Sequence, residues 1–481
     1  MTRFWRIAAV LATLCVALAG LAGVASAAGP SGGNGTRKTN ATGARLDPSY
    51  GIDGSYAVAT GKPEVGEAQQ HTHLALAKDG EAYVLQGTAI TAFTPAGKLD
   101  HSFGKNGRVR VEVGPGELKA LVGIAVDSQG RVLVGGTYEP FPGYVERVIK
   151  GAPKFPASVG ATEAVVVRYL PDGTLDTSFG SGGVAISALG VPLPTDAPAN
   201  GQLPDAEYER PTLTVSKFLV DAQDRPVLGG MYMSAIEWCG YANGYTQSFV
   251  GRLTSSGTLD TSFANSGYQK GQGNELADLA TGQEGRLAVV TDQYDHCAEH
   301  VTAPSSWTTS VLDENGLPSP ELDPARPQPL GASNLTVDGR GDLIYDRWED
   351  VSGLEAPGAP IVVRLLPNGE YDTSFGSNGG ANLKQFEVGP LPVVAVDAKN
   401  RPVVAFGSEE PELVRLTSAG KVDHSFAKKG VLRTKVQRAG KTTPEAIAID
   451  SKGRIVVAGN AEGGSLKTGW GISVTRILPG M

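Results

Sequence analysis

The sequence predicts an all-β protein, a seven-bladed β-propeller of four-stranded antiparallel blades closed by its N-terminal strand. Three observations predict it: a short phrase recurs along the chain, apolar runs of strand length recur between the phrases, and turn-forming residues are abundant. The chain has 64 glycines and 31 prolines among its 481 residues. That composition suits many short strands joined by tight turns rather than packed helices.

The recurring phrase is Asp-x-Ser-aromatic, usually followed by Gly. Six clear copies begin at Asp47, Asp100, Asp176, Asp260, Asp372 and Asp423. A degraded copy that lacks the Ser and the aromatic residue is expected to begin at Asp323. Seven copies between Asp47 and Asp423 give a mean repeat of about 63 residues, and a fixed period of this kind indicates a repeat architecture.

Each repeat carries four strand signals, named here strands a, b, c and d. In one repeat, strand a is the apolar run 217–220, strand b is 225–230, and strand c is 249–257. The phrase that begins at Asp260 and the segment after it form strand d. The runs are rich in Val, Ile and Ala on both faces, as in sheets that are covered on both sides, and propeller blades are such sheets.

The first and last strands predict how the ring closes. The repeats begin with a strand d (47–59) and end with a strand c (472–481), so the N-terminal segment is expected to complete the last blade and to place Asp47 near Arg476. Elsewhere an Arg stands eight residues before the phrase Asp. Hairpins are expected to join these as structural ion pairs: Arg168–Asp176, Arg252–Asp260, Arg364–Asp372 and Arg415–Asp423.

The insertions are predicted to lie on one face of the ring. Turns a–b and c–d are short, whereas the b–c and d–a connections carry the extra length, and alternate turns of a meander fall on the same side. The face with the b–c and d–a connections is named the long-loop face, and the opposite one the short-turn face. Four long loops are expected to enclose the best cavity there: 136–162, 187–214, 230–247 and 291–308.

The repeats resemble the delta-60 repeat family of bacterial exported proteins. The resemblance is carried by the phrases at Asp100–Gly107 and Asp372–Gly379, by strands of the type Gly-Arg-Val-Leu-Val-Gly-Gly, and by strands of the type Val-Arg-Leu-x-Pro-Asp-Gly. It covers roughly residues 47–481. The resemblance implies a propeller, and it transfers no biochemical activity and no catalytic residue.

The N-terminus predicts export. Residues 1–28 read as a signal peptide, with Arg3 and Arg6, an apolar run from Ile7 to Val24, and the small residues of a cleavage site at 25–27. Residues 29–45 are expected to be a disordered linker, and 46–481 the propeller. No later run reaches the ~18 apolar residues of a membrane span. The protein is therefore expected to be secreted or held in the cell envelope without a membrane anchor.

Charge and cysteines limit the partners. The formal net charge is −8, and loss of two arginines with the signal takes it to −10, which argues against nucleic acid or an anionic membrane as partner. Cys239 and Cys297 are the two cysteines left after export. They fall in the b–c loops of neighbouring blades, so a disulfide between them is expected. We expect a monomer.

Aromatic residues in and beside the b–c connections are the candidate binding residues. Clustered surface aromatics favour recognition of a protein or a carbohydrate. Alternatively, long loops need aromatic residues for their own packing. Replacing Trp238 or Trp348 by Ala distinguishes the two, by weakened binding or by lowered thermal stability. The candidates are Tyr138, Phe141, Tyr144, Tyr232, Trp238, Tyr241, Tyr294, Trp307 and Trp348.

No cofactor, metal or catalytic residue is expected. His71 and His73 enter strand a of the first blade near the channel mouth, and His296 and His300 lie in a long loop, but no third ligand is fixed by spacing. The leading prediction is a non-enzymatic binding protein or scaffold that recognises a protein or glycan through its long-loop face. The alternatives are a lyase or hydrolase with its site at the channel mouth, and a passive scaffold. A cluster of two carboxylates, or of His with carboxylates, around the channel mouth would reverse the preference for a binding protein.

Overall fold

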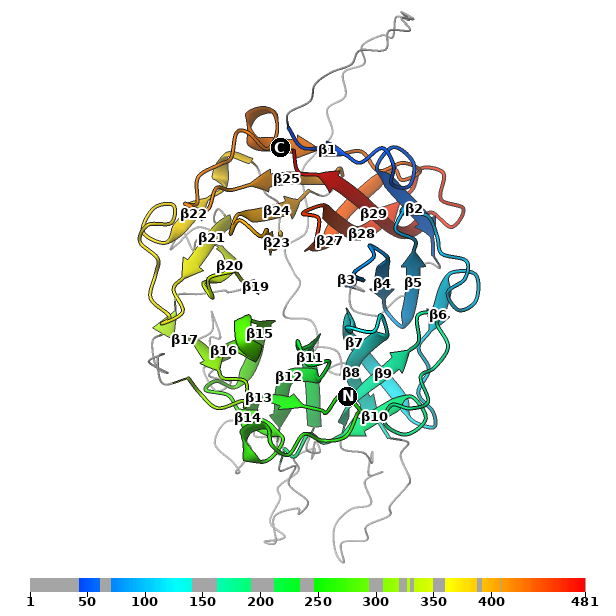
Figure 1. Cartoon of the computed structure of the whole chain (residues 1–481), viewed down its shortest axis with the longest axis vertical. Helices are drawn as coiled ribbons and strands as arrows, with labels where there is room; N and C mark the ends of the chain where they lie inside the picture. Colours follow the sequence, from blue (N-terminus) through cyan, green and yellow to red (C-terminus); the bar gives the residue numbers. More distant parts are fainter. Residues whose placement is uncertain are drawn as a thin grey trace, which may run out of the picture. The chain divides into compact units, whose positions relative to one another are not determined.

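Seven antiparallel sheets follow one another around a ring, one sheet for each repeat (Figure 1). The computed structural model describes residues 43–60, 71–140, 162–191, 212–233, 246–293, 306–319, 327–328, 333–348, 360–386, 392–407 and 409–480. Residues 41–481 form one unit, and everything below concerns that unit. The sequence prediction of a seven-bladed propeller is confirmed.

Blades one to six each contain strands a to d in chain order. Blade one holds β3 (Thr72–Leu76), β4 (Ala82–Gln86), β5 (Ala89–Phe93) and β6 (Arg108–Arg110). Blade two holds β7 (Glu117–Val126), β8 (Val132–Glu139), β9 (Glu163–Tyr169) and β10 (Val184–Ser187). Blade three holds β11 (Thr212–Val220), β12 (Pro226–Met233), β13 (Thr246–Arg252) and β14 (Tyr268–Lys270). Blade four holds β15 (Glu275–Thr281), β16 (Leu287–Gln293), β17 (Ser306–Leu312) and β18 (Pro327–Gln328).

The later blades repeat the pattern. Blade five holds β19 (Ser333–Val337), β20 (Leu343–Trp348), β21 (Pro360–Leu365) and β22 (Gly380–Asn382). Blade six holds β23 (Val393–Val396), β24 (Pro402–Phe406), β25 (Glu412–Arg415) and β26 (Val431–Arg433). Blade seven holds β27 (Lys441–Ile449), β28 (Ile455–Glu462) and β29 (Trp470–Leu478), with β1 (Arg45–Leu46) and β2 (Ser55–Ala59). Short 3-10 turns are η1 (Phe263–Asn265), η2 (Gln283–Gly285), η3 (Lys384–Phe386) and η4 (Lys428–Gly430).

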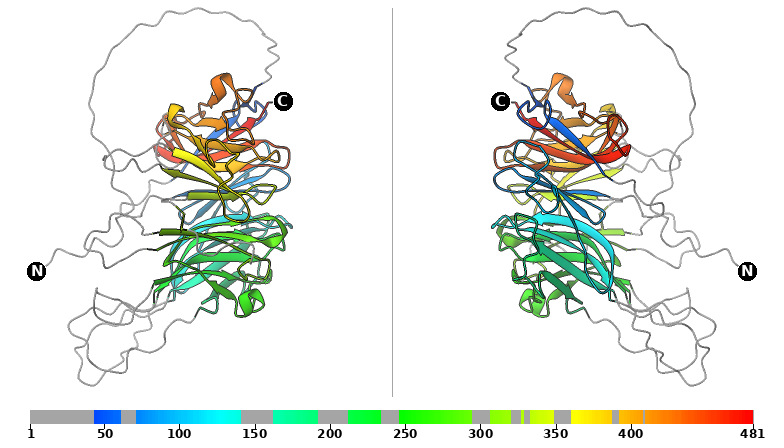
Figure 2. Two further views of the ribbon diagram at one scale, coloured as in Figure 1. Left: turned by 90° about the vertical axis from the view of Figure 1, so that its left-hand side faces the viewer. Right: turned by 90° about the vertical axis from the view of Figure 1, so that its right-hand side faces the viewer.

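Strand a is the innermost strand of every blade. Each strand a contacts the strand a of the next blade around the whole circle, and β27 contacts β3 to complete it. The first strands β3, β7, β11, β15, β19, β23 and β27 surround the centre of the ring in Figure 1. Seen from the side, the strands run roughly along the ring axis, so the two ends of each strand lie on opposite faces (Figure 2).

The N-terminal segment closes the ring as predicted. β2 pairs antiparallel with β29 from Ser55 opposite Thr475 to Ala59 opposite Gly471, and β1 pairs with the other end of β29. Arg476 Nε donates to Asp47 Oδ2 at 2.8 Å. Strands from the two ends of the chain thus share one sheet, which leaves no bare edge on β29.

The predicted Arg–Asp pairs are confirmed, and they also link neighbouring blades. In blade five, Arg364 Nε donates to Asp372 Oδ2 at 2.8 Å, and Arg364 Nη1 donates to the Ser418 carbonyl of blade six at 2.5 Å. The guanidinium lies 4.4 Å from the centre of the Phe375 ring. The same arrangement recurs with Arg168, Arg252, Arg415 and Arg476.

The phrase aromatic residues wedge between blades. A Cβ added at Gly316, in the c–d turn of blade four, would come within 2.3 Å of the Phe263 ring of blade three. Gly97 has the same relation to Tyr50, and both glycines have positive φ. Only glycine lets the turn of one blade approach the aromatic ring of the blade before it so closely, which explains why the turn and the phrase recur together.

The degraded phrase lies four residues earlier than predicted. In blades two and three the phrase Asp donates its backbone N–H to the carbonyl of the paired Arg, as Asp260 does to Arg252. In blade four that bond runs from Ser319 to Val311. The repeat therefore places Ser319, and not Asp323, at the phrase position. Blade four has lost both the Arg and the Asp, and the Asp at 323 belongs to the segment after the phrase.

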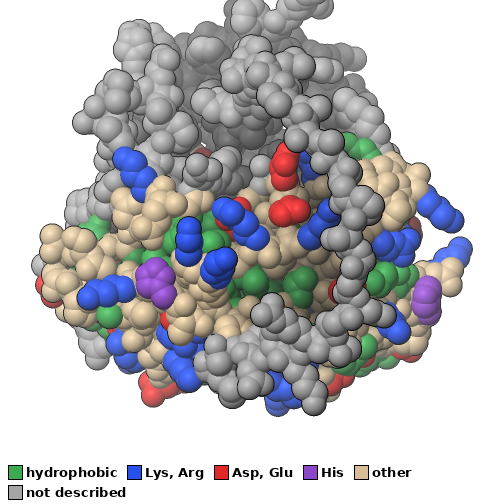
Figure 3. Space-filling model, turned by 90° about the horizontal axis from the view of Figure 1, so that it is seen from above, with side chains coloured by type: hydrophobic (Ala, Val, Ile, Leu, Met, Phe, Trp, Pro, Cys, Tyr) green, Lys and Arg blue, Asp and Glu red, His purple; other side chains and the backbone are tan. Residues whose placement is uncertain are grey.

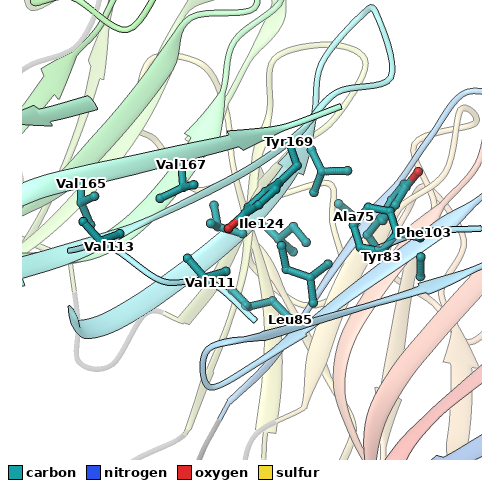
Figure 4. Packing of buried hydrophobic residues seen from close by; sticks show 14 of the residues in the cluster. Ala75, Tyr83, Leu85, Phe103, Val111, Val113, Ile124, Val165, Val167 and Tyr169 are labelled. Atoms are coloured by element: carbon teal, nitrogen blue, oxygen red, sulfur yellow. The ribbon is translucent and has the colours of Figure 1, made fainter. Parts of the chain in front are cut away.

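Each interface between blades is an apolar core. Between blades one and two, Tyr83, Leu85 and Phe103 pack against Val165 and Tyr169 (Figure 4). Tyr83 and Phe103 meet edge to face, with ring centres 5.4 Å apart. Because every sheet is covered by such a core on both sides, its strands have no need of alternating polar residues, as the sequence indicated.

The described outer surface is mainly polar. Lys and Arg side chains are spread over the side of the ring seen in Figure 3, with hydrophobic side chains scattered between them. In the described part of the chain, no helix has the length and apolar character needed to cross a membrane.

Candidate functional site at the channel mouth

One position of strand a recurs in all seven blades around the central axis of the ring, which we name the channel. It lies four residues before the first residue of the a–b turn, whose N–H bonds to the carbonyl four residues later in every blade. The channel ring is defined by these seven residues, from blade one to blade seven: His73, Gly123, Lys217, Asp278, Asn334, Val393 and Ala446. Four of the seven are polar, although this strand is otherwise apolar.

Lys217 and Asp278 form an ion pair inside the channel. Lys217 Nζ lies 3.0 Å from Asp278 Oδ1, and the lysine side chain is 38% exposed whereas the aspartate is buried. Asp278 Oδ1 also accepts the N–H of Leu279 at 2.8 Å, and Asp278 Oδ2 accepts the N–H of Leu335 at 2.8 Å. Asp278 therefore connects blades three, four and five at the axis, with its two oxygens both in use.

His71 and Glu445 form a second pair at the long-loop mouth, because strand a runs from that face toward the short-turn face. His71 Nδ1 lies 3.6 Å from Glu445 Oε2, and the imidazole is 65% exposed. Asn460 donates to Glu445 Oε1 at 3.1 Å. The hydrogen bond with Glu445 raises the pKa of His71, although burial and Lys217 oppose it.

His73 is the channel-ring residue of blade one, and Lys217 holds the same strand position in blade three. Burial first, and then the charges of His71 and Lys217, lower the pKa of His73 to about 4. Its imidazole is therefore neutral at neutral pH. Gly123, the channel-ring residue of the blade between them, has no side chain.

The His71–Glu445 pair joins one imidazole to one carboxylate, and the Lys217–Asp278 pair contains no histidine. The two pairs therefore fall short of the cluster of His with carboxylates that the sequence analysis set as the test for an enzyme. His71 and His73 lie at the start of strand a of blade one. Lys217, Asp278 and Glu445 were missed, because each was taken as part of an apolar run or its flank. Lys217 and Asp278 can be found in the sequence by comparing this one position across all seven repeats. A polar residue at this position differs from the apolar residues that make up most of strand a.

Two of the predicted aromatic residues are packing residues in this structure. Tyr138 and Tyr232 are only 3% and 2% exposed and belong to the cores between blades. The Tyr138 hydroxyl accepts the N–H of Gly116 at 2.6 Å. They lie near the end of strand b, where the preceding blade covers them. For these two residues the packing alternative therefore applies.

The other aromatic candidates are not located by the structure. Trp307 and Trp348 lie on β17 and β20, but their side chains are outside what is described. Phe141, Tyr144, Trp238, Tyr241 and Tyr294 lie outside the described residues, as do Cys239, Cys297, His296, His300 and most of the four long loops. The strand ends that border those loops do lie on one face, since β7 begins and β8 ends side by side at Glu117 and Glu139. Among the described residues, no group of three or more His, Cys, Asp or Glu side chains is placed to hold a metal ion.

A separate buried carboxylate lies near the same end of blade four. Asp292 is directly opposite Glu275 in the sheet, and its Oδ1 has no hydrogen-bond partner among the described residues. Burial and the charge of Glu275 raise the pKa of Asp292 to about 7. Because the folded state holds this proton more tightly than the unfolded state, stability decreases as pH rises from about 4 to about 7.

Replacing Asp292 by Asn is therefore expected to stabilise the protein at pH 8, with a gain that shrinks toward pH 5. The amide keeps the shape and cannot ionise, so the cost of a buried charge next to Glu275 disappears. Melting temperatures of wild type, Asp292→Asn and the exposed control Asp79→Asn between pH 5 and 8 check this. A gain independent of pH would contradict the assignment.

The chain is similar to a propeller family model and, at low sequence identity, to solved propellers. The model described as "Domain of unknown function (DUF5122) beta-propeller" matches residues 157–179 and 239–263. No curated protein matches the chain. A protein of unknown function from Dyadobacter fermentans is 11% identical with a TM-score of 0.36, and the match covers 89% of this chain and 99% of that one.

Two other solved structures are similar at the same level. A gluconolactonase from Xanthomonas campestris is 10% identical with a TM-score of 0.33, covering 91% of this chain and 96% of that one. The propeller domain of a trilobed protease from Pyrococcus furiosus is 9% identical with a TM-score of 0.37, covering 72% and 81%. At these values the likenesses carry nothing about ligand or activity. The matched segments and the seven blades together support a β-propeller built from sequence repeats.

Proposed function

We propose that this protein is an exported, monomeric, non-enzymatic binding propeller whose ligand, a protein or a glycan, sits on the long-loop face over the channel mouth. The observation that carries the proposal is the set of polar side chains from blades one, three, four and seven that face one channel. His73 and Lys217 retain hydrogen-bonding capacity there. Groups of this kind, at the axis of a rigid ring, are suited to fixing a ligand.

The architecture supports binding at this end rather than the other. At the short-turn face the charged groups link neighbouring blades. Arg364, for example, bonds to Asp372 of its own blade and to the Ser418 carbonyl of the next. Toward the long-loop face, Lys217 and His71 keep exposed side chains. Long connections on a rigid scaffold are also where binding residues concentrate, and the undescribed loops leave from this face.

Binding is tested with two substitutions that each remove one positive charge. Lys217→Gln is expected to abolish most of the binding found by glycan-array screening and by pull-down from the native envelope. Lys119→Gln is the matched control, since Lys119 also lies on a strand a but is paired with Glu139 and Glu117. Equal binding by the two variants, both with wild-type melting temperatures, would place the ligand elsewhere.

Export and the disulfide are part of the same proposal. If residues 1–28 are removed on export, the mature chain keeps Cys239 and Cys297 in an oxidising compartment. Thiol labelling of the unreduced, denatured protein is expected to find no free thiol, because the two cysteines are bonded to each other. In the chain-entropy model such a bond contributes roughly 4 kcal/mol at most. Two reactive thiols per exported chain would rule the bond out.

A hydrolase is the second candidate, and the His71–Glu445 pair is the observation that favours it. A carboxylate that orients an imidazole is the arrangement of a general base, with water as the nucleophile. The described residues add no activated Ser or Cys beside it. Turnover of ester, lactone or glycoside substrates that is lost in His71→Ala would support the enzyme, whereas binding that survives in His71→Ala without turnover by wild type favours the binding protein.

A further inference from the structure

We propose that the channel ring recognises a carboxylate of the ligand, held between His73 and Lys217 with His71 at the mouth. This inference rests on the proposed binding function and names the chemical group that the site takes. The inference follows from comparing the polar atoms of the cluster that already have hydrogen-bond partners with those that have none.

Each carboxylate oxygen of the cluster already has a partner within the protein. Asp278 accepts from Lys217, Leu279 and Leu335. Glu445 is bonded by Asn460 and paired with His71. The Asn460 Oδ1 atom accepts from Thr72 and from Gln86, each at 2.8 Å. A ligand that arrives with donors therefore finds the carboxylates in use.

The donors of the cluster are in surplus. An ammonium group has three N–H donors, and the contact described for Lys217 is the one with Asp278. His71 uses Nδ1 toward Glu445, which leaves Nε2. The His73 imidazole makes no hydrogen bond to another described residue. N–H groups left over at neighbouring strand positions favour an oxygen-rich, negatively charged partner.

The electrostatics of the three groups point the same way. After burial, the charges of His71 and Lys217 are what oppose protonation of His73. An anion bound beside His73 and Lys217 relieves that repulsion. Of the other channel-ring residues, Gly123, Val393 and Ala446 have no polar side chain, and Asn334 donates to Asp346 and to the Pro392 carbonyl. The charged end of a ligand is therefore directed toward blades one and three.

The test uses pairs of small probes that differ in one carboxylate. D-galacturonate is compared with D-galactose, and an acetylated dipeptide with a free C-terminus is compared with its amide, by calorimetry on the full chain. At least one acid is expected to bind, and its neutral partner to bind at least about tenfold more weakly, which is the strength of one charge-assisted hydrogen bond. The sugar and peptide arms separate a glycan ligand from a protein ligand.

The variants locate the carboxylate. Lys217→Gln and His73→Gln are each expected to lower the affinity for the acid about tenfold or more. Lys119→Gln is expected to leave that affinity unchanged. Affinity for the acid is also expected to fall between pH 5.5 and 8, because His71 loses its proton and carboxylate binding to the imidazoles takes up protons. The neighbouring charges that also act on this pH dependence are Glu445, Lys217 and Asp278.

Two results would overturn the inference in different ways. If the acid and its neutral partner bind equally, and Lys217→Gln weakens both, the channel binds a ligand but not through a carboxylate, and the proposed function stands. If no probe binds while envelope partners are captured equally by Lys217→Gln and wild type, the channel is not the site and both proposals fail. Melting temperatures of each variant exclude unfolding as the cause.

Discussion

A chain that begins at residue 60 is expected to lose the cooperative unfolding of the propeller. Residues 43–59 supply the outer part of blade seven, including the buried side chains of Tyr50 and Ala57. Without them, β29 becomes a bare edge and Arg476 is left buried without Asp47. An unpaired buried charge alone costs about 3–5 kcal/mol, and loss of a buried aromatic side chain costs a similar amount. Together these approach the whole stability of an ordinary domain.

A chain that begins at residue 43 is the matched control, since it keeps β1, β2 and Asp47. It is expected to unfold in urea as the full chain does, whereas the shorter chain forms aggregates through its open edge. Adding a peptide of residues 43–60 in excess is expected to restore part of the stability of the shorter chain. Identical urea midpoints for the two chains would show that ring closure contributes little.

Replacing Arg364 by Val is expected to lower the free energy of unfolding by about 3–5 kcal/mol. The guanidinium is buried and is shared by Asp372, by Asp342 at 3.7 Å, and by the Ser418 carbonyl of blade six. Its removal leaves two buried carboxylates near Asp338 with Arg340 as the nearest remaining cation. The shift of the urea midpoint measures the loss, and Arg340→Gln, at a largely exposed side chain, is expected to cost less than about 1 kcal/mol.

The double variant Arg364→Val with Asp372→Ser tests whether the loss of stability comes from the carboxylates that are left unpaired. It recreates the residues that blade four carries naturally at Val311 and Ser319, and it removes one of the two carboxylates left unpaired. Replacing a buried ion pair by uncharged residues is often neutral, so the double variant is expected to be more stable than Arg364→Val alone. If it is less stable, the carboxylate contributes through its turn with Ser374 and not through the arginine.

Most of the fold could be predicted from the repeat pattern of the sequence. The phrase and the apolar runs are local signals, and blades one to six are each formed from consecutive residues, so strand order and blade number follow from the sequence. Arg476 and Asp47 could be paired as well, because a repeat that starts in mid-blade has to be completed by the other end. The misplaced phrase in blade four shows the limit, since Ser319 keeps the backbone bond but none of the side chains that mark the motif.

The sequence by itself determined the propeller, its closure and its structural ion pairs, since these rest on contacts within a repeat or between repeats in fixed order. The tertiary structure alone decided what lies in the channel and what is covered. His71 and Glu445 are far apart along the chain, as are Lys217 and Asp278, and each pair meets because seven first strands surround one axis. Tyr138 and Tyr232 look like surface aromatics in the sequence and are buried, because the preceding blade covers the end of strand b. The raised pKa of Asp292 likewise depends on burial and on Glu275 across the sheet. Burial and proximity across blades are properties of the closed ring, which no single repeat contains.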